Sequence, residues 1–332
     1  MAIIGGGGHS ANDPIYVDTL ESLNQVLAGD YQYIAFPEVY NGPKVLDYRN
    51  KGWISSPIID FSWDNDYGKQ KNVYFNGWTI LGLSIMDCNV WHWWISSSEY
   101  KLRFYDLIVK NMYILANRSD SRFVDMGYSG SVYFINCKFS MVLDAQNAHA
   151  YFCAPSSSGY GENTFSQCSF NVQLVSTSSS YRALFLSSDA YHTIAKNCLF
   201  NFNSIKFYSP GYERSTALLS FYSLNFCKVT GSLVIISSTA SDVGIVVADS
   251  YCTYNAVEIA TKVMINNRTI RIQIPSGTNV IKSDVHVKSD GVTLNTVSYD
   301  SGHSFLADSS QYIDADYLNQ HSFLVGTAPA GV

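Results

Sequence analysis

The stretch that decides the fold is Asn136-Cys137-Lys138-Phe139-Ser140-Met141-Val142-Leu143, in which every second residue from Cys137 onward is apolar. Alternate side chains of an extended strand point to the same face, so a period of two predicts a strand with one buried face. The pattern returns in residues 168–174 and 198–202, where the intervening residues are mostly polar. The opposite face of these strands is therefore expected to meet water.

The beginning of this stretch belongs to a short motif that occurs seven times. Its second residue is Cys in six copies and Met in one, and its fourth residue is always apolar. The copies are Asp87-Cys88-Asn89-Val90, Asn111-Met112-Tyr113-Ile114, Asn136-Cys137-Lys138-Phe139, Gln167-Cys168-Ser169-Phe170, Asn197-Cys198-Leu199-Phe200, Phe226-Cys227-Lys228-Val229 and Tyr251-Cys252-Thr253-Tyr254. Successive copies lie 24 to 31 residues apart. A drifting period of this size predicts a solenoid in which each coil stacks on the previous one.

We therefore predict an all-β chain that forms a right-handed, single-stranded parallel β-helix. The second residues of all seven copies are expected to stack in its interior as one ladder. Small apolar thiols are among the most buried side chains, which favours reduced packing cysteines. Neither a disulfide nor a metal site is expected, because neighbouring rungs hold their Cβ vectors parallel and the chain has no CxxC pair. Cys153 lies outside the register and receives no role.

Composition excludes some classes of partner. The chain has 332 residues, of which 47% are hydrophobic and 14% charged, and it carries a net charge of −6. Without a basic cluster, binding to nucleic acid or to an acidic membrane is not expected. No apolar run is long enough to cross a bilayer, and the first residues lack the pattern of a signal peptide. We expect synthesis in a cytosol, no membrane insertion and no cofactor.

The chain divides into four predicted segments. Residues 1–20, which include four consecutive glycines, form an attachment arm that is either a flexible tail or a segment ordered only against a partner. Residues 21–70 supply a capping helix and the first strands, and residues 71–262 form the β-helix. Residues 263–332 form a C-terminal β cap or oligomerisation region, in which Asp290-Gly291 predicts a hairpin.

The capping helix has recognisable start and stop signals. Leu20, Leu23 and Leu27 fall on one helical face, and Gly29 is a natural stop. Thr19 is the predicted N-cap, with Ser22 too short to complete a capping box. Such a helix would cover the open first coil and protect its strand edges.

With this opening helix, the strand Tyr33-Ile34-Ala35-Phe36-Pro37 and the Asn-Cys-x-Phe coils, the chain resembles the pectin-lyase-like β-helices of bacteriophage tailspikes and other virion spikes. The resemblance covers residues 15–262. It implies a virion protein that is a parallel homotrimer, attaches to other virion proteins through its N-terminal arm, and binds or cleaves host surface polysaccharide. A calcium-binding acidic group of the kind found in lyases with this fold is not evident.

Candidate catalytic residues are acidic, because glycoside hydrolysis needs two carboxylates that flank the scissile bond. One cluster, residues 118–125, contains Asp120 and Asp125 in a predicted loop between coils. The equivalent loops of later coils carry Glu162, Asp189 and Glu213. Ordinary solvated turns also favour acidic residues, so solvated turn residues are the alternative interpretation of these five.

Candidate ligand-binding residues are aromatic. Continued alternation from Cys88 and Val90 predicts that His92 points inward and that Trp91 and Trp93 point outward. Exposed aromatic rings serve sugar stacking and subunit contact equally well. Tyrosines in predicted loops extend the same group: Tyr128, Tyr160, Tyr191 and Tyr212.

Three functions compete at this level. The first, which we favour, is a virion spike or fibre that binds host glycan without cleaving it. The second is a polysaccharide depolymerase, a hydrolase or lyase, on the same scaffold. The third is a purely structural decoration or adaptor protein of the particle. Paired acids in one groove would favour the depolymerase, whereas tryptophans buried between subunits would favour the structural protein.

Overall fold

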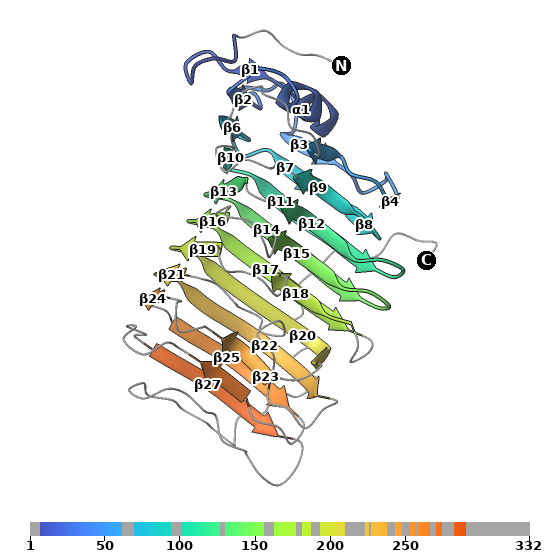
Figure 1. The fold of residues 1–332 in the computed structure, drawn as a ribbon, viewed down its shortest axis with the longest axis vertical. Coiled ribbons are helices and arrows are strands. Elements are labelled where there is room, and N and C mark those ends of the chain that lie inside the picture. Colours follow the sequence, from blue (N-terminus) through green and yellow to red (C-terminus); the bar gives the residue numbers. More distant parts are fainter. Residues whose placement is uncertain are drawn as a thin grey trace.

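A computed structural model gives the architecture of the chain. It describes residues 7–61, 70–93, 101–126, 130–155, 163–176, 181–186, 193–209, 223–225, 227–237, 243–247, 253–255, 258–265, 270–273 and 282–289. Within these ranges the protein is a parallel β-solenoid with one short helix at its N-terminal end (Figure 1). The predicted fold class is confirmed.

Three parallel sheets form the walls of the solenoid. The first sheet has nine strands: β1 (Ile15–Tyr16), β2 (Tyr33–Ala35), β6 (Gln70–Tyr74), β10 (Lys101–Tyr105), β13 (Ser131–Ile135), β16 (Asn163–Ser166), β19 (Thr193–Lys196), β21 (Ser223–Asn225) and β24 (Thr253–Asn255). The second sheet has eleven: β3 (Val45–Asp47), β4 (Trp53–Ile54), β7 (Thr79–Leu81), β8 (Ser84–Met86), β11 (Ile108–Ala116), β14 (Lys138–Ala145), β17 (Ser169–Ser176), β20 (Leu199–Ser209), β22 (Lys228–Ser237), β25 (Glu258–Ile265) and β27 (Lys282–Ser289).

The third wall, which we call the lateral sheet, is shorter. It contains β5 (Ile59–Phe61), β9 (Asn89–Trp93), β12 (Ser121–Met126), β15 (Ala150–Pro155) and β18 (Ala183–Leu186). Nearer the C-terminal end, β23 (Val243–Val247) pairs with β26 (Ile270–Gln273). A typical coil contributes one strand to each wall, as β13, β14 and β15 do (Figure 1).

Phenylalanine ladders fill the interior. Phe139, Phe170 and Phe200 of the second sheet stack with ring centroids 5.2 Å apart, nearly parallel. Equivalent stacks run through the other two walls: Phe104, Phe134 and Phe165 in the first sheet, and Phe123, Phe152 and Phe185 in the lateral sheet. Because the rings are buried and offset by one rung, each pair contributes about 0.5–1.5 kcal/mol beyond its hydrophobic burial.

We predicted that the second residues of all seven motif copies form one ladder. This prediction is wrong for the first two of them, Cys88 and Met112. Strand pairing aligns Ile108 with Lys138, so Leu107, and not Met112, occupies the corner that Cys137 occupies in the next coil. Met112 instead pairs with Met141, beyond a bulge in β11. Cys88 precedes β9 at a different corner, and Cys252 lies outside the described residues.

The reason for this error lies in the backbone. Asp87, Asn111 and Asn136 all have positive φ values, of 55°, 55° and 53°. A short polar residue that tolerates the left-handed region marks any sharp bend of the chain, not one particular corner. The true coil is 29 to 31 residues long, since Ile108, Lys138, Ser169, Leu199 and Lys228 pair in succession.

The four cysteines that share one corner are Cys137, Cys168, Cys198 and Cys227, and all are buried. The Sγ atom of Cys168 lies 3.2 Å from the Phe134 carbonyl oxygen of the preceding coil, and the other three thiols make the equivalent contact. A thiol is a weak donor, so each one partly satisfies a carbonyl at the bend. Cys153, also buried, aligns with Val124 and Leu186 and fills the lateral wall.

Helix α1 (Leu20–Leu27) lies over the first coil (Figure 1). The Thr19 side chain accepts a hydrogen bond from the Ser22 backbone N–H, and the Ser22 hydroxyl lies 3.1 Å from the Thr19 backbone nitrogen. The capping box is therefore present, and our expectation that Ser22 is too short was wrong. No helix in the described parts of the chain has the length and apolar character needed to cross a membrane.

The parallel pairing continues beyond residues 71–262 at both ends. β1, from the segment predicted as an arm, pairs with β2, and the Val17 side chain is fully buried. β27, from the predicted C-terminal region, pairs with β25 over eight residues. The predicted hairpin at Asp290-Gly291 lies outside the described residues.

Candidate functional site

Trp91 does not lie on the surface, contrary to our prediction. Its side chain is 3% exposed, and its ring centroid lies 4.7 Å from those of Phe104 and Phe123. Val90 is also fully buried, so two consecutive residues of β9 face the core. Strict alternation therefore does not hold in this strand, and the same doubling occurs at Phe123 and Val124 in the neighbouring strand β12.

Most other predicted site residues fall outside the described residues. This holds for the acids Glu162, Asp189 and Glu213 and for the aromatic residues Tyr128, Tyr160, Tyr191 and Tyr212. Trp93 ends β9, but its side chain is not described. Asp120 and Asp125 are described, and they define the first candidate site.

Asp125 lies within β12 and not in a loop as predicted, whereas Asp120 lies in the turn that joins β11 to β12, as predicted. Asp125 pairs in register with His92, and His92 pairs with Asp60. Next to this column, Asn89, Arg122 and Tyr151 form a second one. We call the outer side of the lateral sheet the lateral face; its polar residues are Asp60, Asn89, His92, Asp120, Arg122, Asp125, His149 and Tyr151.

Arg122 is the centre of the lateral face. Its guanidinium nitrogens lie 3.1 Å from Asp120 Oδ2 and 3.4 Å from Asp125 Oδ2. Asp125 Oδ2 also accepts a hydrogen bond from Asn89 Nδ2 at 2.7 Å. The Arg122 and Asp125 side chains are only 26% and 17% exposed, so this network is held more rigidly than an ordinary surface ion pair.

His92 extends the network across a further coil. Its Nδ1 lies 3.6 Å from Asp60 Oδ1, and its Nε2 lies 3.9 Å from Asp125 Oδ2. The side chain is 28% exposed on the lateral face, whereas alternation had predicted an inward orientation. Acidic and basic groups therefore alternate over three successive rungs.

His149 forms the opposite end of the lateral face. Its backbone N–H donates to Asp120 Oδ1 at 2.9 Å, and its Nδ1 accepts from the Arg182 backbone N–H at 3.0 Å. Burial, more than the charges nearby, lowers the pKa of His149. Because Nδ1 is an acceptor, the neutral ring carries its proton on Nε2, which makes Nε2 a hydrogen-bond donor.

Aromatic rings border these polar groups. The Tyr151 ring lies under the Arg122 guanidinium, with 5.8 Å between Cζ and the ring centroid. His149 lies 5.9 Å from Tyr151 and 5.8 Å from Tyr181. Burial raises the pKa of Tyr151 to about 12, so its hydroxyl stays protonated at neutral pH.

The chemistry available here is hydrogen bonding rather than metal binding. Within the described residues, no three His, Cys, Asp or Glu side chains lie close enough to share a metal ion. Carboxylates, an amide and a guanidinium instead present planar groups with two donor or acceptor positions each.

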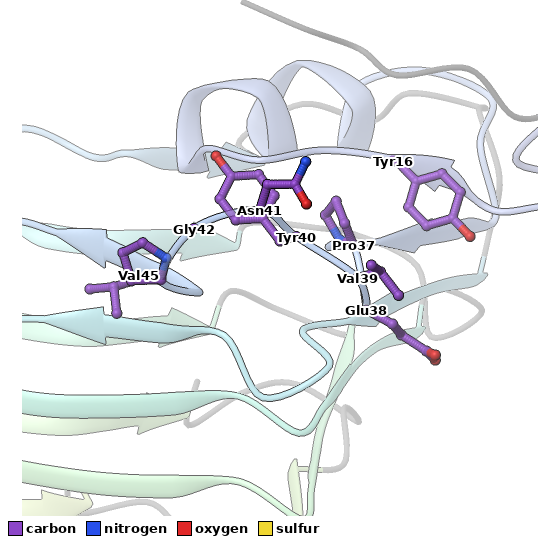
Figure 2. A pocket seen from close by; sticks show the side chains of 9 residues that line it. Tyr16, Pro37, Glu38, Val39, Tyr40, Asn41, Gly42 and Val45 are labelled. Carbon is purple, nitrogen blue, oxygen red and sulfur yellow. The ribbon is translucent and has the colours of Figure 1, made fainter.

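A second candidate site is a hollow of about 1020 Å³ at the N-terminal end of the solenoid (Figure 2). It is lined by Tyr16, residues 37–43 and Val45. Two tyrosines, Tyr16 and Tyr40, and two planar polar side chains, Glu38 and Asn41, are among these residues (Figure 2). None of the residues that line it was predicted as a site residue.

Comparison of the chain with protein-family models, with curated proteins and with solved structures found no match.

Proposed function

We propose that this protein is an appendage of a bacteriophage particle, a tail spike or fibre, and that its lateral face binds host surface polysaccharide without cleaving it. The biological setting rests on the resemblance of the coils and the opening helix to virion spikes. The binding role rests on one observation, the network of Asp120, Arg122, Asp125, Asn89 and His92 on the outside of a rigid parallel sheet.

Such a network suits a polyhydroxylated ligand. Planar groups accept from or donate to two neighbouring hydroxyls, and their positions are fixed by the strands before the ligand arrives. Polar residues of different kinds occupy successive rungs, about 4.8 Å apart, so a chain-like ligand would meet hydrogen-bonding groups from neighbouring coils along the axis of the solenoid.

Binding without cleavage is favoured by the pairing of the acids. Hydrolysis needs one carboxyl group that carries a proton and a second carboxylate across the scissile bond. Asp120 and Asp125 instead both pair with the guanidinium of Arg122, which lies between them. This arrangement suits hydrogen bonding to a ligand better than proton donation.

The assembly remains part of the proposal. We expect a homotrimer in which coils of three chains lie side by side and the C-terminal region contributes to association. Light scattering on the full chain tests this, and a stable monomer at micromolar concentration contradicts it. For attachment to the particle, deletion of residues 1–6 is the appropriate test, because deletion through β1 would remove a strand of the first sheet.

The glycan-binding test uses capsular polysaccharide and lipopolysaccharide from candidate hosts, immobilised for measurement of binding and of chain shortening. We expect binding by the native chain, a loss of at least tenfold in affinity for Arg122→Gln, and no shortening. The matched control is Arg49→Gln, which breaks an exposed Arg–Asp ion pair with Asp47 away from the lateral face.

Each contrary result has a distinct meaning. If Arg122→Gln folds and binds as well as the native chain, the lateral face is not the binding site. If the polysaccharide is shortened, and Asp120→Asn abolishes shortening while binding survives, the protein is a depolymerase.

A further inference from the structure

The first coil departs from the others at one corner. Strand pairing aligns Ala35 with Tyr74, and Val45 with Thr79. Nine residues lie between Ala35 and Val45 in the first coil, whereas four lie between Tyr74 and Thr79 in the second. In the following coils, only two residues separate the equivalent strands. Insertions into a solenoid collect in loops, often on the face that binds a ligand. Residues 36–44 therefore form an expanded loop at a corner where the later coils have only two residues.

The expanded loop is fixed at both ends. Asn76 Nδ2 donates to the Phe36 carbonyl at 2.7 Å, and Trp78 Nε1 donates to the Pro37 carbonyl at 2.9 Å. At the other end, Lys44 Nζ donates to the Asn76 carbonyl at 3.2 Å. A loop held in this way loses little entropy when a ligand binds.

Despite this rigidity, the loop exposes apolar side chains. Val39 is 89% exposed and Tyr40 is 45% exposed, and they are two of the three exposed large hydrophobic residues in the described parts of the chain. The Tyr40 ring packs against Trp78 with centroids 4.8 Å apart, so its orientation is set by the core. An oriented, half-exposed ring is a stacking platform.

We propose that the hollow bounded by this loop is a second carbohydrate site, which takes one or a few rings of a neutral sugar. Its volume of about 1020 Å³ is just above the range that is typical of small-molecule sites, about 300–1,000 Å³. A stable protein interface would require about 20 to 30 residues from this chain, whereas nine residues line the hollow.

The lining also selects the ligand class. Tyr16 and Tyr40 supply apolar ring faces, and Glu38 and Asn41 supply acceptors and donors for hydroxyl groups (Figure 2). Glu38 is the only charged side chain among the lining residues. The ammonium of Lys44 is held at the Asn76 carbonyl and does not line the hollow. Acidic sugars are therefore repelled, and neutral sugars are accepted.

The test uses the full chain and saturation-transfer NMR with the methyl glycosides of glucose, galactose, mannose and N-acetylglucosamine. Methyl glucuronide is the acidic probe. At least one neutral glycoside should bind saturably at millimolar concentration, and the glucuronide should not. Tyr40→Leu, which keeps an apolar contact with Trp78, and Asn41→Ala should each weaken binding at least tenfold, whereas Tyr40→Phe and the distant Arg49→Gln should not.

Three results would overturn the proposal. One is the absence of binding by every neutral glycoside, and another is equal binding of the glucuronide. The third is binding that survives Tyr40→Leu and Asn41→Ala but is lost in Arg122→Gln, which would place the sugar on the lateral face. The proposal shares its ligand class with the proposed function, but the two fail separately, because polysaccharide binding through Arg122 is measured independently.

Discussion

Lys71 is a buried lysine whose replacement should change the pH dependence of stability. It lies in β6 with 4% of its surface exposed, and its Nζ donates to the Gly29 carbonyl just beyond the end of α1. Burial lowers its pKa from 10.5 to about 8, against the opposing charge of Asp30. In the unfolded chain the ammonium keeps its proton up to the ordinary pKa.

Proton linkage gives the direction and the magnitude of the change in the free energy of unfolding with pH. Between about pH 8 and pH 10.5 the folded state binds fewer protons than the unfolded state, so the free energy of unfolding rises with pH across this window. A shift of about 2.5 units corresponds to about 3.4 kcal/mol. Below about pH 8, burial of the charged Lys71 ammonium destabilises the folded protein by this full amount, and above about pH 10.5 this destabilisation is absent.

Lys71→Met keeps most of the aliphatic packing and removes the charge. The Gly29 carbonyl then loses its donor, which costs about 1.5 kcal/mol at every pH. The variant should therefore be about 2 kcal/mol more stable than the native chain at pH 7, and about 1.5 kcal/mol less stable above pH 10.5. The difference should change sign between these conditions.

Urea unfolding followed by circular dichroism at both pH values measures this difference. Comparing the variant with the native chain at each pH cancels the titration of groups that both share. Lys51→Met, at an exposed position, is the control and should change stability by less than about 0.5 kcal/mol. A stability difference for Lys71→Met that is the same at both pH values would refute the claim that the ammonium is desolvated.

Three further predictions concern the interior. Trp91→Ala should lower the free energy of unfolding, measured with urea, by about 3–5 kcal/mol. A folded Trp91→Ala protein that loses polysaccharide affinity without this destabilisation would contradict the place of Trp91 in the core. Cys168→Asp should give no soluble folded protein in an expression test, because it buries an unpaired charge, whereas Cys168→Ala should remain folded. Tyr113→Phe removes the donor to Asp144, 2.6 Å away, and should cost about 1.5–3 kcal/mol at pH 7. Burial already raises the pKa of Asp144 and the Tyr113 hydrogen bond opposes this, so the deficit should shrink as the pH falls and Asp144 is protonated; a deficit that grows on acidification would contradict this.

The fold was predictable because parallel coils repeat one physical requirement. Alternation at residues 137–143 predicts a strand with a buried face, and repetition predicts stacking. The coil length was not predictable from the motif, because Asp87 and Asn111 mark other left-handed bends with the same residue types. A correct length near 30 residues would have aligned Leu107 with Cys137.

The candidate sites were less predictable for two reasons. Two acids of the lateral face, Asp120 and Asp125, were identified, but Asn89 and His149 become their partners only through pairing of strands in neighbouring coils. Trp91 was assigned to the wrong face because Val90 and Trp91 are both buried, so strict alternation does not hold in this short strand. The N-terminal hollow depends on a corner expansion that is visible only against the register of the following coils.

The buried cysteines of successive coils allow the unfolding of the solenoid to be followed by thiol alkylation. Hydrogen bonding to Cys168, with burial, raises the pKa of Cys198 to about 12, so very little of this thiol is the reactive thiolate at neutral pH. In the folded protein these thiols should resist alkylation. Cys137, Cys168, Cys198 and Cys227 belong to four successive coils, and each coil contacts mainly its neighbours. The order in which an alkylating reagent modifies them in dilute denaturant therefore reports the order in which the coils open, and shows from which end the protein unravels.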